Sequence, residues 1–321
     1  MPLKTAICDL LGIEVPVLLA GMGGVSYAEV TAAVSNAGGF GCLGMASAGP
    51  DEIRREMRRV RELTDKPFGV DLLTPVPDQL ERACDVIIEE GAAAFVSGLG
   101  VPTAILPRLK AAGLVVMSVV GRVHHARKAE DAGVDAVIAQ GTEAGGHTGS
   151  VAGMALIPQV VDAVDIPVIA AGGIFDGRGL AAALALGAQG VWVGTRFIAS
   201  VEARADQAYK DTILQAAEDQ TVVTRCYTGK TLRAFDNPYI RDWERRPQDL
   251  KPFPEQAIHS IKAGVIGGIG GQVTDIDPSK DCLPMGQGCG AIHEVLPAAE
   301  IVRRMVAEAR GAITLMAGLA G

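Results

Sequence analysis

Residues 179–195 read GLAAALALGAQGVWVGT. The first eight residues, 179–186, are small or apolar and predict a helix. Gly187 then supplies the left-handed residue that commonly ends a helix, and the apolar run from Gly190 predicts a buried strand. One helix therefore leads directly into one strand, which is the repeating unit of a parallel sheet.

The same order of helix, glycine and strand recurs through the first two thirds of the chain. Eight short apolar runs predict strands, and they begin at Val15, Gly39, Pro67, Ala92, Leu114, Val134, Ile166 and Gly190. Helical stretches separate them at residues 28–36, 51–63, 78–90, 103–111, 123–131 and 179–186. Eight such units favour an α/β fold of the closed (β/α)8 TIM-barrel type, whose usual size is about 250 residues. An open doubly wound sheet is the alternative, but it does not need eight near-equal units.

The pattern changes after residue 200. Residues 202–220 are polar and helical, and a last helix is expected over residues 296–310. We predict that residues 1–200 and 290–321 form the barrel, and that residues 201–289 form a smaller, largely helical region that covers the substrate.

The composition limits the partners that this chain can have. Its 321 residues are 49% hydrophobic, enough for a sizeable core, and its net charge of −8 comes without any basic run. This balance excludes nucleic acid and anionic membrane surfaces. The six cysteines show no metal-binding spacing, and no segment resembles a signal peptide or a membrane span. We therefore expect a cytoplasmic protein with reduced thiols, no metal and a small-molecule partner, and a homodimer stays open.

Two glycine-rich loops follow the seventh and eighth predicted strands. Gly172 and Gly173 end the seventh strand, and Gly194 and Thr195 end the eighth. In TIM barrels a phosphate often binds at these two loops, and glycine leaves backbone N–H groups uncovered for it. The placement favours a phosphate-bearing cofactor, with Arg196 as an added charge. The alternative is that these glycines only make tight turns.

A third glycine cluster, Gly21, Gly23 and Gly24 around Met22, ends the first predicted strand. No phosphate is left for it to bind, so a flat ring over a backbone with few side chains would explain it. An isoalloxazine is such a ring, and FMN joins it to a single phosphate. A plain turn before the next helix stays open as the alternative. No G-x-G-x-x-G follows an early strand, which argues against a nicotinamide bound as in Rossmann folds.

Three motifs follow successive strands: GTEAGGHTG at residues 141–149, AAGGI at 170–174 and GTRF at 194–197. Together with AGMGGVS from Ala20, these motifs resemble the nitronate monooxygenase family, and the likeness runs from the first to the eighth strand. That family includes FMN-dependent nitronate oxidisers, NADH:quinone reductases and flavin-dependent enoyl-acyl-carrier-protein reductases.

The resemblance implies FMN as the cofactor and His147 as the catalytic residue that faces the substrate. The predicted cofactor-binding residues are Ala20, Gly21, Met22, Gly23, Asp71, Gln140, Gly145, Gly146, Gly172, Gly173, Gly194, Thr195 and Gln287. On this view the glycines of residues 141–149 make room for the flavin. His124 and His125 begin a helix without glycines around them, so solvent exposure or capping is expected there.

Two positions depart from the pattern of the family. Many members have Asn where this chain has Asp71, and an amide can donate to a flavin oxygen whereas a carboxylate only accepts. Several nitronate oxidisers have Lys at the end of the fifth strand, where residues 118–120 read SVV. An apolar residue at that place resembles the reductases more.

The leading hypothesis is an FMN-dependent nitronate monooxygenase, which oxidises an alkyl nitronate with O2 to a carbonyl compound and nitrite. His147 would orient the anion, or act as a base on a neutral nitroalkane, because the usual pKa of histidine suits either task. The alternative is an NAD(P)H-dependent reductase of quinones or enoyl thioesters on the same flavin. A flavin-binding protein without catalytic activity is the third hypothesis.

Overall fold

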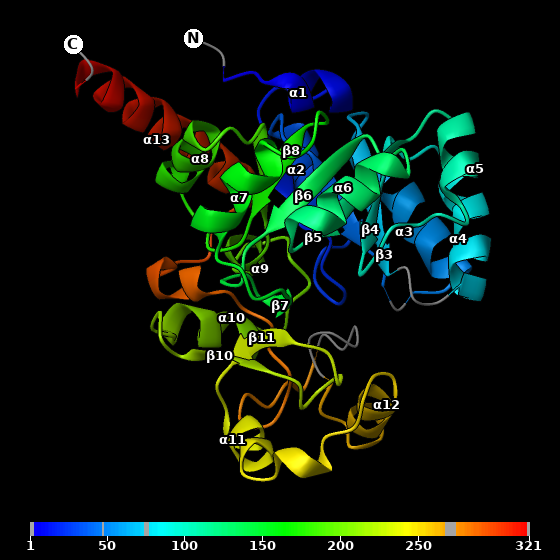
Figure 1. Ribbon diagram of the computed structural model, residues 1–321, viewed down its shortest axis with the longest axis vertical. Coiled ribbons are helices and arrows are strands. Elements are labelled where there is room, and N and C mark those ends of the chain that lie inside the picture. The colour runs from blue at the N-terminus through cyan, green and yellow to red at the C-terminus, as the bar shows by residue number, and fades with distance from the viewer. Residues whose placement is uncertain (1–2, 47, 74–76, 267–273, 320–321) are drawn as a thin grey trace.

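The structure is a computed structural model that describes residues 3–46, 48–73, 77–266 and 274–319. Eight parallel strands form a barrel with helices around it (Figure 1). The strands are β1 (Val17–Leu19), β2 (Gly41–Gly44), β3 (Phe68–Leu73), β4 (Ala94–Gly98), β5 (Val115–Val120), β6 (Ala136–Gln140), β8 (Val168–Ala171) and β9 (Gly190–Val193). They pair in the order β1-β9-β8-β6-β5-β4-β3-β2, and a parallel bridge between Leu18 and Phe40 links β1 to β2. The eight predicted strands and the TIM-barrel class are confirmed.

The helices of the barrel agree with the predicted ones in most positions. They are α1 (Ala6–Leu11), α2 (Ala28–Asn36), α3 (Pro50–Leu63), α4 (Pro77–Glu89), α5 (Leu106–Ala111), α6 (Val123–Asp131), α7 (Gly153–Val161), α8 (Gly177–Ala185) and α13 (Ala298–Leu319). Helix α13 continues to residue 319 instead of ending at 310. Helix α7, which is not among the predicted helices, contains Pro158, a residue that weakens any helical prediction.

The barrel strands are apolar on both faces because two separate cores pack against them. Leu18 points into the barrel, where it joins Ile7 and Leu11 of α1. Its neighbours Val17 and Leu19 pack with the outer helices, because successive strand residues point to opposite sides. Helix α1 closes the end where the strands begin. The loops at the opposite end are therefore the ones that are free to build a site.

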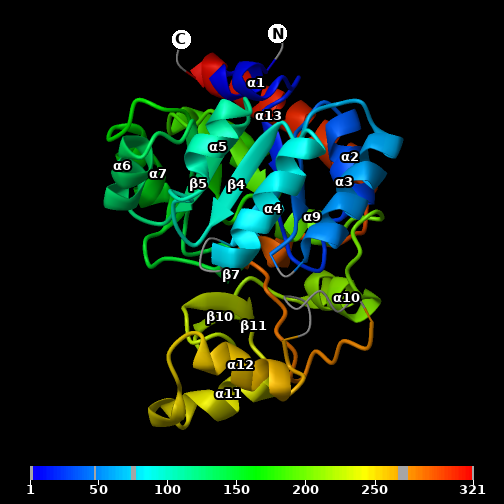
Figure 2. The same cartoon turned by 90° about the vertical axis from the view of Figure 1, so that its right-hand side faces the viewer.

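A second region begins where the chain leaves the barrel after α9 (Thr195–Ile198). Ser200 and Leu296 form a parallel bridge, so the chain returns to the barrel at the point where it left. The region lies against one end of the barrel (Figure 1, Figure 2). Its elements are α10 (Gln207–Gln215), β10 (Thr221–Thr224), β11 (Leu232–Phe235), α11 (Pro238–Glu244), α12 (Glu255–Lys262) and the short 3-10 helices Pro247–Asp249 and Gln287–Ala291.

An antiparallel hairpin adds strands to the helices predicted for this region. β10 pairs with β11, and β11 also pairs with β7 (Gly146–His147), a two-residue strand in the loop after β6. Leu232 lies opposite His147 in this small sheet. Local sequence patterns do not reveal the pairing of β11 with β7, because β7 comes from a barrel loop far earlier in the chain. The boundaries at residues 201–289 and their substrate-covering role stay predictions.

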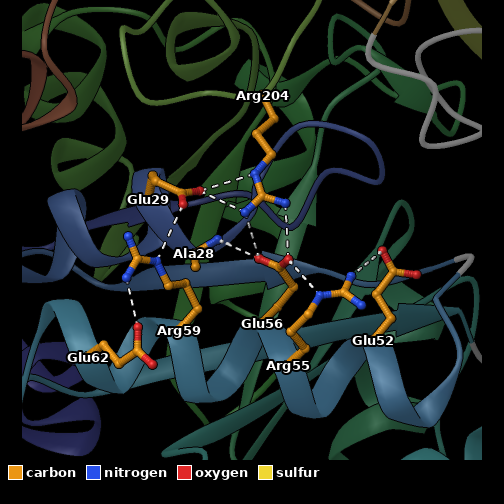
Figure 3. Close-up of polar contacts among 8 residues, drawn as sticks. All are labelled: Ala28, Glu29, Glu52, Arg55, Glu56, Arg59, Glu62 and Arg204. Carbon is orange, nitrogen blue, oxygen red and sulfur yellow. Dashed lines mark hydrogen bonds and ion pairs between the residues drawn. The ribbon is translucent and has the colours of Figure 1, made fainter.

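Arg204 ties the start of this region to two barrel helices (Figure 3). Its guanidinium donates to Glu29 on α2 at 3.0 Å and to Glu56 on α3 at 3.0 Å. The side chain of Glu56 is only 3% exposed, and it also accepts from the Ala28 amide at the start of α2. The Arg204 amide donates to the carbonyl of Val25 at 3.2 Å. Arg204 therefore also holds the chain that follows the glycine cluster after β1.

Each of the six cysteines is buried and free. Burial raises the pKa of the Cys42 and Cys282 thiols well above the usual range, which keeps them protonated and unreactive. Within the described ranges, no helix is long and apolar enough to cross a membrane. Nor do three His, Cys, Asp or Glu side chains of those ranges gather into a metal site.

Candidate active site

A cavity of about 1140 Å³ lies between the C-terminal ends of the barrel strands and the region after residue 200. Nearly all of the predicted site residues line it: Ala20, Gly21, Met22, Gly23, Asp71, Gln140, Gly145, Gly146, His147, Gly172, Gly173, Gly194 and Thr195. Gln287 is the exception, because its side chain is exposed and only its backbone amide takes part, donating to the carbonyl of Glu143 at 3.0 Å. The structure thus brings together residues from four separate glycine-rich loops.

Three backbone amides at the ends of β8 and β9 are available to bind an anion. The amides of Gly172, Gly173 and Gly194 donate to no acceptor among the described residues, although β8 and β9 are neighbours in the barrel. A Cβ on Gly194 would meet nothing nearer than the Met22 sulfur at 3.4 Å. An uncovered backbone with unused donors fits a phosphate group. These residues fit the cofactor phosphate that the sequence predicts.

Arg196 does not join this cradle, contrary to the expectation that it adds charge there. Its guanidinium is buried and donates to the carbonyls of Ala199 at 2.7 Å and Glu294 at 2.5 Å. Burial lowers the pKa of Arg196 to about 10. Arg196 lies on the short helix α9, and its side chain does not line the cavity. Its position in the sequence alone does not reveal this direction.

The glycine loop after β1 is pressed against the neighbouring strands. A Cβ on Gly21 would lie 2.2 Å from Cβ of Asp71, and one on Gly44 would lie 2.3 Å from the backbone of Met22. Asp71 lines the cavity, and burial raises the pKa of its carboxyl well above the usual range. A neutral carboxyl can donate as well as accept a hydrogen bond. Asp71 can therefore make the kind of contact that an amide makes.

His147 lies on β7 and is held at both its backbone and its ring. Gln140 donates to the carbonyl of His147 at 2.6 Å, and the preceding Gly146 has φ +76, a conformation that favours glycine. The ring atom Nε2 lies 3.0 Å from Oγ1 of Thr228. Thr228 is itself held by Lys230, whose amide donates to its hydroxyl at 3.3 Å. The donor between the His147 ring and Thr228 depends on the ring tautomer.

The environment of His147 keeps its ring neutral. Burial, followed by the positive charge of Lys230, lowers the pKa of His147 to about 4. At neutral pH the ring therefore carries no charge. A group works best in proton transfer when its pKa lies near the working pH. The lowered pKa therefore suits His147 to orienting a polar substrate group more than to proton transfer.

The glycines of residues 141–149 mostly make room for the protein itself. A Cβ on Gly145 would lie 2.7 Å from the carbonyl carbon of Met285, and one on Gly141 would lie 2.3 Å from a carboxylate oxygen of Glu143. A Cβ on Gly146 would meet nothing within 4 Å. Neighbouring backbone and Glu143 fill the space at Gly141 and Gly145, whereas the space beside Gly146 is open. The expectation that these glycines make room for a flavin stays a prediction.

Glu143 is a supporting residue that the sequence reasoning missed. Both of its carboxylate oxygens accept from the Gly153 amide, at 2.9 and 3.0 Å, where α7 begins. A carboxylate there is favoured by the unpaired amides of a helix start. Its side chain also packs on Gly173 of the phosphate cradle. The acid within the 141–149 motif was the available signal, but only the fold shows that it joins α7 to the cradle.

Comparison with known proteins assigns the family. A family model described as nitronate monooxygenase matches residues 4–308. The chain belongs to the nitronate monooxygenase family. It is therefore an enzyme, a flavin-dependent oxidoreductase on a TIM barrel.

The relatives of this protein are named for different activities. A probable nitronate monooxygenase of Staphylococcus saprophyticus is 36% identical over 302 residues, which cover 80% of this chain and 85% of the relative. The (3aS,4S,5R,7aS)-5-hydroxy-7a-methyl-1-oxo-octahydro-1H-indene-4-carboxyl-CoA dehydrogenase of Mycobacterium tuberculosis is 44% identical over 247 residues, which cover 76% of this chain and 69% of the relative. The structure of FabK from Thermotoga maritima superposes with a TM-score of 0.90 at 38% identity, covering 98% of this chain and 99% of that one. Family membership thus leaves the reaction open.

Proposed function

We propose that this protein binds FMN and reduces an enoyl thioester with electrons from NAD(P)H. One observation carries the proposal: the cavity of about 1140 Å³ exceeds the roughly 300–1,000 Å³ that encloses one drug-sized ligand. A flavin against the strand ends leaves space for a large second ligand. The carboxyl-CoA dehydrogenase that is 44% identical to this chain is named for a thioester substrate, which supports the choice.

The end of β5 also supports a large apolar substrate. Val119 and Val120 line the cavity beside Ser118, where several nitronate oxidisers carry Lys. On the opposite side, Phe253 and Ile261 of the later region also line it. Apolar walls with a few polar groups are typical of sites that enclose an organic chain.

Each residue of the site then has a task. A bound flavin supplies hydride transfer between nicotinamide and substrate. The amides of Gly172, Gly173 and Gly194 would hold its phosphate, and the Asp71 carboxyl, whose pKa burial raises, would hydrogen-bond its ring. His147, which lines the same cavity, would position a polar group of the substrate next to the flavin.

Nitronate oxidation is the second candidate. The family model bears that description, and a nitronate is already an anion, so it needs no strong base. The positive charge of Lys230 next to His147 would attract such an anion. A nitronate of a few atoms, however, would fill little of the space that remains beside the flavin.

Anaerobic stopped-flow measurements on the flavin-loaded enzyme separate the candidates. We expect NADH or NADPH to bleach the flavin and crotonyl-CoA to restore its colour. Bleaching by a nitronate but not by either nicotinamide would overturn the thioester proposal in favour of nitronate oxidation. A flavin that responds to none of these compounds would indicate a binding protein without this activity.

The variant His147→Ala tests the proposed position of the substrate. Loss of one hydrogen bond to a polarised group is worth about 1.5–3 kcal/mol, so we expect re-oxidation by crotonyl-CoA to slow by about 10- to 100-fold. Flavin content and bleaching by NADPH should stay close to those of the wild-type enzyme. An unchanged rate of re-oxidation would remove His147 from the substrate site.

A further inference from the structure

Three residues at and just before the start of α6 reach the cavity. His125 and Lys128 are spaced three residues apart on α6, which places them on the same side of the helix, and Arg122 is the extended residue that precedes the helix. All three are exposed and line the cavity. His125 was expected to be merely solvent-exposed or capping, so its place at the cavity rim is a finding of the structure.

Three cations around the cavity, Arg122, Lys128 and Lys230, lack acidic partners, and we call them the basic rim. Arg122, Lys128 and Lys230 line the cavity, and none of them forms an ion pair with a residue in the described part of the chain. Among the described residues that line the cavity, the acidic side chain is Asp71, which lies on β3 at the strand ends. In a protein of net charge −8, three uncompensated cations around one cavity indicate an anionic ligand.

The rim is separate from the phosphate cradle and close to His147. The cradle follows β8 and β9, whereas the start of α6 follows β5. The loop at Gly121 packs against Gly149, at the end of the His147 loop, because a Cβ on Gly121 would lie 3.4 Å from Cα of Gly149. The Lys230 ammonium lies 4.6 Å from the ring centroid of Phe253. The rim therefore offers positive charge beside an apolar side chain of the cavity wall.

We propose that Arg122, Lys128 and Lys230 form a second anion subsite that binds the diphosphate of a nucleotide-bearing substrate. This inference rests on the proposed function, since both the thioester and the nicotinamide of that reaction can carry such a group. Coenzyme A and NADP⁺ share a diphosphate and a sugar phosphate. Arg and Lys bind phosphate oxygens through charge-assisted hydrogen bonds. The cofactor phosphate stays in the glycine cradle.

Binding to the flavin-loaded enzyme tests the subsite without turnover. We compare the wild type with Arg122→Gln/Lys128→Gln by calorimetric titration with coenzyme A, NADP⁺ and pantetheine. The variant should bind at least one of the two nucleotides about tenfold more weakly, as expected when charge-assisted contacts worth about 1.5–3 kcal/mol are lost. Pantetheine, which carries no phosphate, should bind the two proteins alike.

Arg127→Gln is the matched control, because Arg127 lies on the same helix and is exposed but does not line the cavity. Weaker binding of coenzyme A alone would assign the subsite to the thioester, and weaker binding of NADP⁺ alone would assign it to the nicotinamide. Unchanged affinity for both nucleotides, or an equal loss in Arg127→Gln, would overturn the proposal. If the subsite binds nucleotides but the enzyme turns over only nitronates, the proposed function fails and the subsite stands.

Discussion

At the scale of the residue, the neutral ring of His147 makes stability depend on pH. Histidine in an unfolded chain titrates near 6.5, whereas burial lowers the pKa of His147 to about 4. At pH values between the folded pKa of about 4 and the unfolded value near 6.5, the unfolded chain binds more protons than the folded chain. The free energy of unfolding therefore rises with pH in this range. The contribution is fully present above about pH 6.5 and is lost as the pH falls toward 4, with a magnitude of up to about 3 kcal/mol.

We predict that His147→Gln loses less stability on acidification than the wild type, since glutamine does not titrate. Urea unfolding of both proteins at about pH 7 and about pH 4.5 measures the difference. When the pH is lowered, the free energy of unfolding should fall less in the variant than in the wild type. An equal loss in both proteins would show that the ring titrates as freely in the folded state as in the unfolded state.

Two glycines of the phosphate cradle should respond differently to alanine. Gly194 has φ −105 and room for a methyl group, with the flexible Met22 sulfur 3.4 Å away. Gly172 has φ +99, and its Cβ would lie 3.1 Å from the carbonyl oxygen of Gly141. We predict that Gly194→Ala folds with near-wild-type stability but holds less flavin, whereas Gly172→Ala also loses about 1–3 kcal/mol from backbone strain.

The ratio of flavin to protein absorbance and urea unfolding check this pair of variants. If Gly194→Ala retains a full complement of flavin, its methyl group does not meet the phosphate. The phosphate would then lie elsewhere, and the proposed cradle would be wrong.

At the scale of the element, Arg204 joins the later region to α2 and α3 (Figure 3). Its removal would leave the buried Glu56 carboxylate without its main partner. We predict that Arg204→Gln lowers the free energy of unfolding by about 1–3 kcal/mol, the cost of an unpaired buried hydrogen-bonding group. Arg303→Gln is the control, because Arg303 is 68% exposed in its pair with Glu300, and such pairs contribute about 0–1 kcal/mol. Equal effects on urea unfolding would contradict the structural role of Arg204.

At the scale of the whole molecule, the proposed phosphate cradle at Gly172, Gly173 and Gly194 is separate from the basic rim. We predict that heating releases FMN, and mass spectrometry of the released chromophore measures this. An adenine-containing flavin would extend beyond the cradle, and its adenylate would then bind to the cations of the basic rim. That result would refute both the FMN assignment and the substrate subsite at Arg122 and Lys128.

The sequence by itself determined the barrel. Each strand is a short apolar run, and each helix end such as Gly187 depends on residues next to it in the chain, so local patterns suffice to locate them. The loops at Gly172 and Gly194 were also readable, because in a TIM barrel their order along the chain fixes which end of the barrel they reach. The resemblance to the family, carried by the motif at residues 141–149, singled out His147, which lines the cavity.

The tertiary structure alone decided what surrounds these loops. It turned Arg196 away from the cradle and Gln287 toward the exterior, and it paired β7 with a hairpin from the later region. It also brought the α6 cations to the same cavity as His147. Side-chain direction and pairing between distant segments depend on contacts made only when the chain is folded, so no local pattern of residues encodes them.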